Sequence, residues 1–253
     1  STNEAVYLLQ KLLRAGWQSN GIDFPGREVR QKLFSLMQKY GDAQWVNQEL
    51  AGLGQVDAIF LLGDGIEETA PVAATMIRRA ARNRKAVVVQ LSSRADALTP
   101  FAATAIQVAP VLWSAIVQEL ARAAAGKPGA SFDPGKHGMK VEEWSNLEKA
   151  LAGRSAVALV FPEALLGSAK TEAAVSALFD LASASGQMEG KSGAGLYPLT
   201  SEINTTGALL MGASPDFLPG LVAVADDVGR GNLAGVWQVS ELPGGAWPSI
   251  EKG

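Results

Sequence analysis

The residues best suited to bind an anion lie directly after a predicted buried strand. Residues 58–62 form a continuous apolar run, which the segment Gly63-Asp64-Gly65 follows before a predicted helix. In a doubly wound α/β fold, backbone N–H groups at such a turn and the helix N-terminus favour phosphate. The match to G-x-G-x-x-G is incomplete because Glu68 occupies the third glycine position, and the carboxylates of Glu67 and Glu68 would repel a pyrophosphate.

The second predicted strand, 86–91, also departs from the dinucleotide-binding pattern. In that pattern an acidic side chain near the end of this strand holds a ribose hydroxyl, whereas Leu91-Ser92-Ser93 stands in its place here. We therefore expect an ordinary strand–helix turn, with intact dinucleotide binding as the alternative.

Other chemistry-bearing residues are few. The 253 residues include no cysteine, which excludes disulfides, iron–sulfur clusters and thiolate metal ligands in this chain, and one histidine, which excludes a multi-histidine metal site. His137 lies in a glycine- and proline-rich loop, where we expect a solvated side chain. The pair Asp226-Asp227 could act as acid and base or bind a cation, but a solvated turn is favoured because no further oxygen ligands lie nearby in the sequence. We predict no catalytic residue and no metal site.

Charge and hydropathy exclude further classes. Twenty-two basic against twenty-five acidic residues give a net charge of −3 and no basic field for nucleic acid. The basic run 78–85 is interpreted as charge at a helix C-terminus, with a docking patch as the alternative. No apolar stretch is long enough for a membrane helix, and residues 1–4 do not resemble an export signal. We expect a cytoplasmic protein with no nucleic-acid partner and no direct membrane insertion.

The elements that would position these residues follow an α/β pattern. Apolar runs predict strands over 58–62, 86–91, 105–108 and 156–161, and helical spacing predicts helices over 3–15, 27–39, 71–82, 112–125, 141–151 and 171–185. Asn3 is the expected N-cap of the first helix. The order predicts a doubly wound, Rossmann-like parallel sheet with helices on both faces, followed by an irregular glycine-rich C-terminal region.

Several passages resemble the molybdopterin oxidoreductase family, which includes formate dehydrogenase and the related large subunit of NADH:quinone oxidoreductase (respiratory complex I). Residues 3–12 and 19–23 are similar to its "NE-x-x-YLxQK…TNN(I/V)D" passage, and 58–71 to its strand followed by "G-x-N-x-x-E-x-(H)P". The tail from 195 to 220 resembles its "NN-x-QGA-x-DMGALPD-x-x-PG" loop, and 240–243 is the "SELP" that follows. These passages occur in the family's order over nearly the whole chain.

The departures from the family concern its active centre. Molybdenum enzymes of the family carry a cysteine or selenocysteine shortly after the "(I/V)D" position, whereas this chain has Phe24-Pro25-Gly26-Arg27 there. The acid associated with the guanine nucleotide of the cofactor is also absent, and Asp64 replaces an asparagine. The resemblance implies that molybdopterin does not bind and that the nearest relative is the complex I subunit, whose iron–sulfur clusters lie in domains preceding this one.

The resemblance further implies a scaffold that contacts other peripheral-arm subunits of the respiratory complex, and so a cytoplasmic, membrane-associated location. We expect a helix over 1–21 that belongs with a C-terminal subdomain, a Rossmann-like domain over 22–190, and a truncated second subdomain over 191–253. The alternatives are a pterin-binding formate dehydrogenase module and a stand-alone small-molecule-binding protein. Candidate positions of a vestigial cofactor pocket are Gly63, Asp64, Gly65, Ser92, Asn204, Gly207 and Met211.

Overall fold

The computed structural model describes residues 2–24, 26–40, 48–127, 132–185, 192–200, 204–213 and 230. Contacts divide the chain into two compact units, one formed by 1–30 with 202–253 and the other by 31–201. Among the described residues, no helix combines the length and the hydrophobicity needed to cross a membrane.

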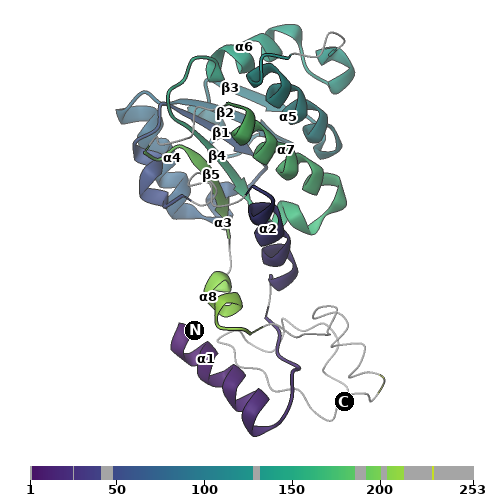
Figure 1. Cartoon of the computed structure of the whole chain (residues 1–253). Coiled ribbons are helices and arrows are strands. Elements are labelled where there is room, and N and C mark those ends of the chain that lie inside the picture. The colour runs from purple at the N-terminus through teal and green to yellow at the C-terminus, as the bar shows by residue number, and fades with distance from the viewer. Residues whose placement is uncertain are drawn as a thin grey trace. The chain divides into compact units, whose positions relative to one another are not determined.

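The larger unit is built on a five-stranded parallel sheet with strand order β3-β2-β1-β4-β5 (Figure 1). Its strands are β1 (Ala58–Leu62), β2 (Val87–Ser92), β3 (Thr104–Gln107), β4 (Val157–Pro162) and β5 (Gly195–Leu199). Every residue of β1 and β4 is buried, as expected for strands with both faces covered. This order matches five strands of the Rossmann arrangement, which confirms the predicted fold class.

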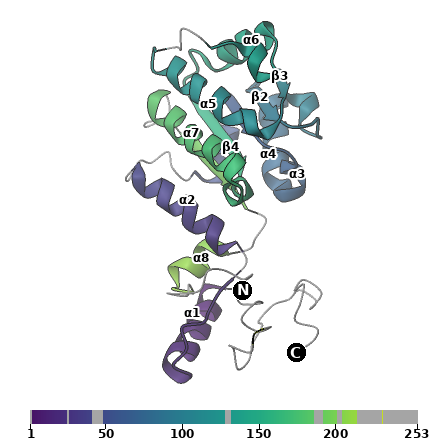
Figure 2. The same cartoon turned by 90° about the vertical axis from the view of Figure 1, so that its right-hand side faces the viewer.

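Helices cover both faces of this sheet. After β1 come α3 (Ile66–Thr69) and α4 (Pro71–Asn83), and after β3 come α5 (Pro110–Ala124) and α6 (Val141–Leu151). Helix α7 (Ala169–Ser185) joins β4 to β5. Because parallel crossovers are right-handed, α4 lies on one face and α5, α6 and α7 on the other; Figure 2 shows α5 beside α7.

Polar contacts connect helix α2 (Arg27–Lys39) and the residue after it to α7. Lys32 forms an ion pair with Glu172 at 2.6 Å, and the Tyr40 hydroxyl that follows α2 donates to Asp180 Oδ1 at 2.5 Å. Burial and the adjacent Asp180 carboxylate both raise the pKa of Tyr40. The part of α2 that belongs to the larger unit is therefore linked to α7.

Strand β5 is an element that the sequence pattern does not predict. It lies within 191–253, the range expected to hold a second subdomain, and it pairs with β4 from Ala158↔Gly195 to Pro162↔Leu199. The Tyr197 hydroxyl donates to the Gly193 carbonyl at 2.6 Å, and burial raises the pKa of Tyr197. The strand is not predicted because three of its five residues are a glycine, a tyrosine and a proline, which weaken the apolar pattern from which strands are predicted.

The smaller unit contains α1 (Asn3–Lys11), a π-helical turn over Leu12–Gly16, and α8 (Thr205–Leu210). Its described apolar cluster has four buried residues, Val6, Ile22, Ala208 and Ala213, and four partly buried side chains pack against them: Leu9, Leu13, Phe24 and Met211. The predicted N-cap Asn3 is wrong: Thr2 caps the helix, because its Oγ1 accepts from Ala5 N at 3.3 Å. Asn3 is instead the first residue of the helix.

Candidate functional site

The candidate site lies at the carboxyl ends of β1 and β2. Gly63 and Gly65 both have positive φ, +110° and +65°, a region that favours glycine. They turn the chain from β1 into α3, and Gly65 is the residue that precedes this helix. The turn therefore has the glycine geometry that the sequence suggests for an anion-binding loop.

An acidic side chain of the protein itself occupies this turn. Asp64 Oδ1 accepts from the backbone N–H of Ser93 at 2.7 Å, and its Oδ2 accepts from the Ser93 hydroxyl at 2.5 Å. The backbone N–H of Arg94 also donates to Oδ1 of Asp64, at a longer distance of 3.4 Å. Donors after β2 that could have bound a ligand oxygen are therefore used by Asp64.

Glu67 repeats this arrangement three residues later. Its Oε1 accepts from the backbone N–H of Ala97 at 3.0 Å, in the same loop after β2. An incoming phosphate would meet the carboxylates of Asp64 and Glu67 at this edge, and like charges repel. The sequence indicates the charge of Glu67 but not the backbone group that it binds.

The remainder of the loop is stabilised by its own polar residues. Asp96 Oδ1 accepts from the N–H groups of Leu98 and Thr99, at 2.9 and 3.2 Å. The Thr99 hydroxyl donates to Oε1 of Gln90, a fully buried residue of β2, at 2.9 Å. Sequence reasoning missed this network, although an aspartate two and three residues before the groups it binds is a recognisable turn signal.

The carboxyl ends of β1 and β4 lie close together. In this strand order the chain reverses direction across the sheet between these two strands, which is where doubly wound folds bind ligands. A Cβ added to Gly63 would lie 3.2 Å from Pro162 Cδ and 3.3 Å from Leu165 Cδ1. The short helical turn Glu163–Gly167 therefore packs against the end of the first strand at the point where a ligand would enter.

Ser92 lies at the end of β2 and is fully buried. Its carbonyl accepts from Val108 N at 2.9 Å, while its Oγ has no hydrogen-bond partner among the described residues. Together with Gly63, Asp64 and Gly65, it forms the part of the predicted pocket that the larger unit contains.

The remaining candidates belong to the smaller unit and have evident packing roles. Asn204 has a φ of +63°, and its carbonyl accepts from Ala208 N at 2.9 Å at the start of α8. At Gly207 an added Cβ would overlap Oδ1 of both Asn3 and Asn204, so a larger residue there would require these side chains to move. Met211 packs against the apolar cluster of this unit.

The segment after Asp23, where the family resemblance places the molybdenum ligand, is arranged around an ion pair. Asp23 Oδ1 accepts from Arg27 Nε at 2.7 Å and from Phe24 N at 2.8 Å. The charged side chains of Arg27 and Asp23 are only 8% and 5% exposed, so the pair is largely shielded from water. Phe24 packs against the apolar cluster. The local chemistry is structural and offers no thiolate or imidazole.

Two other polar segments are more closely packed than the sequence indicates. His137 is half-buried rather than solvated, and its ring stacks on Phe132 with centroids 4.8 Å apart. In the basic run, Arg78 and Arg82 lie over the Phe101 ring, at 5.8 and 4.8 Å from its centroid. They therefore stabilise the loop after β2 by cation–π interaction, besides adding charge to the helix end.

The metal prediction can be compared with the described residues alone. No group of three or more histidine, aspartate or glutamate side chains within them is placed to hold an ion. The pair Asp226-Asp227 lies outside the described residues, so its predicted role stays a prediction.

With this geometry established, comparison with known proteins gives the family. Residues 1–242 match the family described as molybdopterin oxidoreductase. The chain belongs to the molybdopterin oxidoreductase family. This confirms the family resemblance drawn from the sequence, while the assignment to one particular respiratory subunit is a separate question.

Individual relatives of this molybdopterin oxidoreductase domain are distant. "Probable oxidoreductase YjgC" of Bacillus subtilis is 26% identical over 271 residues, which cover 94% of this chain and 26% of the relative. "NADPH-Fe(3+) oxidoreductase subunit alpha" of Geobacter sulfurreducens is 27% identical over 247 residues, covering 87% of this chain and 29% of that protein. The chain spans less than a third of the length of these curated relatives.

Proposed function

We propose that this molybdopterin oxidoreductase domain is a scaffold without molybdenum chemistry, in the large cluster-bearing subunit of an NADH:quinone oxidoreductase. The observation that carries the proposal is the Asp64 carboxylate, which accepts hydrogen bonds from both the N–H and the hydroxyl of Ser93. A dianionic cofactor phosphate needs those donors and an absence of negative charge. The residues at this edge therefore do not fit the family's cofactor.

Two further observations support the loss of the cofactor. Pro162 and Leu165 lie close to Gly63, beside the point where a doubly wound sheet would admit a ligand. The segment that holds a cysteine or selenocysteine in molybdenum enzymes here contains the shielded Asp23–Arg27 pair. Groups that stabilise the fold thus occupy both the anion site and the position of the metal ligand.

The electron-transfer context rests on the relatives and on the sequence passages. The Geobacter relative is named as a subunit of an NADPH-Fe(3+) oxidoreductase, and that name denotes electron transfer from a pyridine nucleotide. In the proposed complex, electrons pass from NADH through iron–sulfur clusters in other domains towards quinone. This domain provides surfaces for neighbouring peripheral-arm subunits and carries no redox group itself.

The principal competing function is that of a cofactor-binding domain in a formate dehydrogenase-like or NADPH-dependent oxidoreductase. The names of both relatives favour it, because each is called an oxidoreductase in its own right. A stand-alone nucleotide-binding protein is the third alternative. A nucleotide present at a hundredfold over its dissociation constant would stabilise that protein by about 2.7 kcal/mol.

To test the proposal, the polypeptide is tagged in the cells whose genome encodes it and is purified in a mild detergent. We expect it to migrate with NADH:quinone oxidoreductase activity on a native gel and to contain no stoichiometric molybdenum. Migration as a separate species with bound molybdenum and formate- or NADPH-dependent activity would replace this proposal with the competing one. A Tm increase with a nucleotide would favour the stand-alone protein instead.

A further inference from the structure

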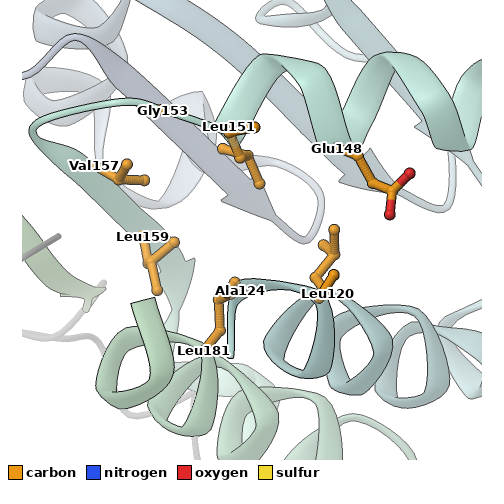
Figure 3. A pocket seen from close by; sticks show the side chains of 10 residues that line it. Leu120, Ala124, Glu148, Leu151, Gly153, Val157, Leu159 and Leu181 are labelled. Atoms are coloured by element: carbon orange, nitrogen blue, oxygen red, sulfur yellow. The ribbon is translucent and has the colours of Figure 1, made fainter. Parts of the chain in front are cut away.

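A cavity of about 370 Å³ lies on the helical face formed by α5, α6 and α7, at the amino end of β4 (Figure 3). It is partly open to solvent. Its lining residues come from these three helices, the strand and the loop before it, and are mostly apolar. The large ones are Leu120, Leu151, Val157, Leu159 and Leu181.

Small residues create this space. Ala123 and Ala124 at the end of α5 face Ala152 and Gly153 in the loop after α6. Protein interiors are otherwise packed as densely as organic crystals, so four small residues around one space leave a gap that larger side chains would fill. The volume falls within the range of about 300–1,000 Å³ typical of small-molecule sites, which are also lined mainly by apolar groups.

One charged side chain faces this apolar surface. Glu148 of α6 is the charged residue among those that line the cavity, and Figure 3 shows it at the edge of the apolar lining. Glu148 is half-buried, and its carboxylate has no hydrogen bond or ion pair with any described residue. A carboxylate held against apolar side chains gains most from a cationic or hydrogen-bond-donating partner.

We propose that this cavity binds a small amphiphilic amine, with its apolar part against Leu120, Leu159 and Leu181 and its ammonium group beside Glu148. The site lies at the amino end of the strands, whereas Asp64 and the loop after β2 lie at their carboxyl ends. It is therefore separate from the family's cofactor region and independent of the scaffold proposal.

The probe is 4-phenylbutylamine, titrated into the whole chain by calorimetry, with 4-phenylbutyrate and 4-phenylbutanol as analogues of the same skeleton. We expect the amine to bind with a dissociation constant on the order of a millimolar or tighter. The alcohol should bind about fivefold more weakly, since it lacks the ion pair with a half-exposed carboxylate, and the acid should bind more weakly still. Equal affinities for the amine and the acid, or no binding of the amine up to its solubility limit, would overturn the proposal.

Variants then locate the binding. Glu148→Gln should lower the affinity for the amine about fivefold and leave that for the alcohol unchanged, whereas Glu142→Gln, on an exposed position of the same helix, should change neither. Ala123→Leu and Ala124→Phe narrow the cavity and should each weaken both ligands. Glu148→Gln leaves the core intact, so it tests the site even if the larger residues disturb folding. An unchanged preference for the amine over the alcohol in Glu148→Gln would show that the ammonium lies elsewhere.

Discussion

The carboxylate of Asp64 accepts a hydrogen bond from the backbone N–H of Ser93 at 2.7 Å and another from its hydroxyl at 2.5 Å. Asp64 follows β1 and Ser93 follows β2, so this contact joins the turn that binds phosphate in doubly wound folds to the loop after the next strand. An anion is thus present at the site, but it belongs to the protein. Glu67 extends the same relationship to Ala97.

Removal of this internal anion should cost stability. We expect Asp64→Ala to lower the free energy of unfolding by about 1–2 kcal/mol, because it leaves the Ser93 donors to water, and urea denaturation measures this. The matched control is Glu68→Ala, which removes an exposed carboxylate from the same turn and should have an effect within about 0.5 kcal/mol. Equal losses in the two variants would contradict the structural role of Asp64.

The same variant should expose an anion site. Inorganic phosphate, compared with chloride at equal ionic strength, should raise the Tm of Asp64→Ala more than that of the unaltered protein, since the freed N–H groups can donate to a ligand oxygen. Identical responses of the two proteins to phosphate would show that the Ser93 donors are not available as an anion site.

Asp57 should make stability depend on pH in the acid range. Its carboxylate accepts from Ser155 N, Ser155 Oγ and Ala156 N, each at 2.9 Å, which ties the start of β1 to the start of β4. Burial alone would raise the pKa of Asp57, but these hydrogen bonds outweigh it and the pKa is lowered. The folded state therefore binds fewer protons, so this stabilisation is fully present above the unfolded pKa of about 3.9 and declines as pH falls through the folded value.

Asp57→Asn tests that dependence. At pH 7 it should lower the free energy of unfolding by about 1–2 kcal/mol, and the difference from the unaltered protein should shrink as the pH is lowered below about 4. Urea denaturation at several pH values measures both. A difference that stays constant through the acid range would contradict a charged hydrogen-bonding role for Asp57.

Close backbone packing beneath β5 can be tested with two neighbouring glycines. A Cβ on Gly52 would lie 2.5 Å from Tyr197 Oη and 2.8 Å from Gly193 Cα, whereas one on Gly54 meets nothing within 4 Å. Gly52→Ala should therefore destabilise the protein by about 1–3 kcal/mol, while Gly54→Ala should be neutral or stabilise by up to about 1 kcal/mol. Thermal unfolding compares the two variants. Equal effects would contradict the close approach of Gly52 to Gly193 and Tyr197.

Breaking the shielded Asp23–Arg27 ion pair of the smaller unit should lower the free energy of unfolding by a larger amount. Asp23→Ala leaves Arg27 largely buried without its 2.7 Å carboxylate partner, and we expect a loss of about 3 kcal/mol. Glu28→Ala removes an exposed charge next to Arg27 and should have little effect. Similar Tm values for Asp23→Ala and Glu28→Ala would show that the ion pair does not contribute measurably to stability.

Sequence patterns suffice for the elements with strong periodicity. The apolar run of β1 and the helical spacing of α2 and α6 predict their bounds, because burial on both faces or on one face dictates those residue types. Strand β5 escapes prediction because Tyr197 and Pro198 interrupt its apolar run.

At the candidate site, the sequence shows the charge of Asp64 but not its partners. Ser93 lies twenty-nine residues away, and only the parallel pairing of β1 with β2 brings the two together. The approach of Pro162 and Leu165 to Gly63 is likewise beyond sequence reasoning, since it depends on β4 lying next to β1. The expectation for His137 is wrong because loop composition does not reveal a stacking partner such as Phe132.

The most direct test of the central claim is the cofactor content of the polypeptide that contains these residues, purified from a host that makes molybdopterin. Molybdenum is measured by mass spectrometry and the pterin by fluorescence after oxidation. Because carboxylates occupy the anion site, we predict that both are far below one equivalent per chain. Molybdenum and pterin near one equivalent would contradict the account, since the cofactor would then bind despite Asp64 and Glu67.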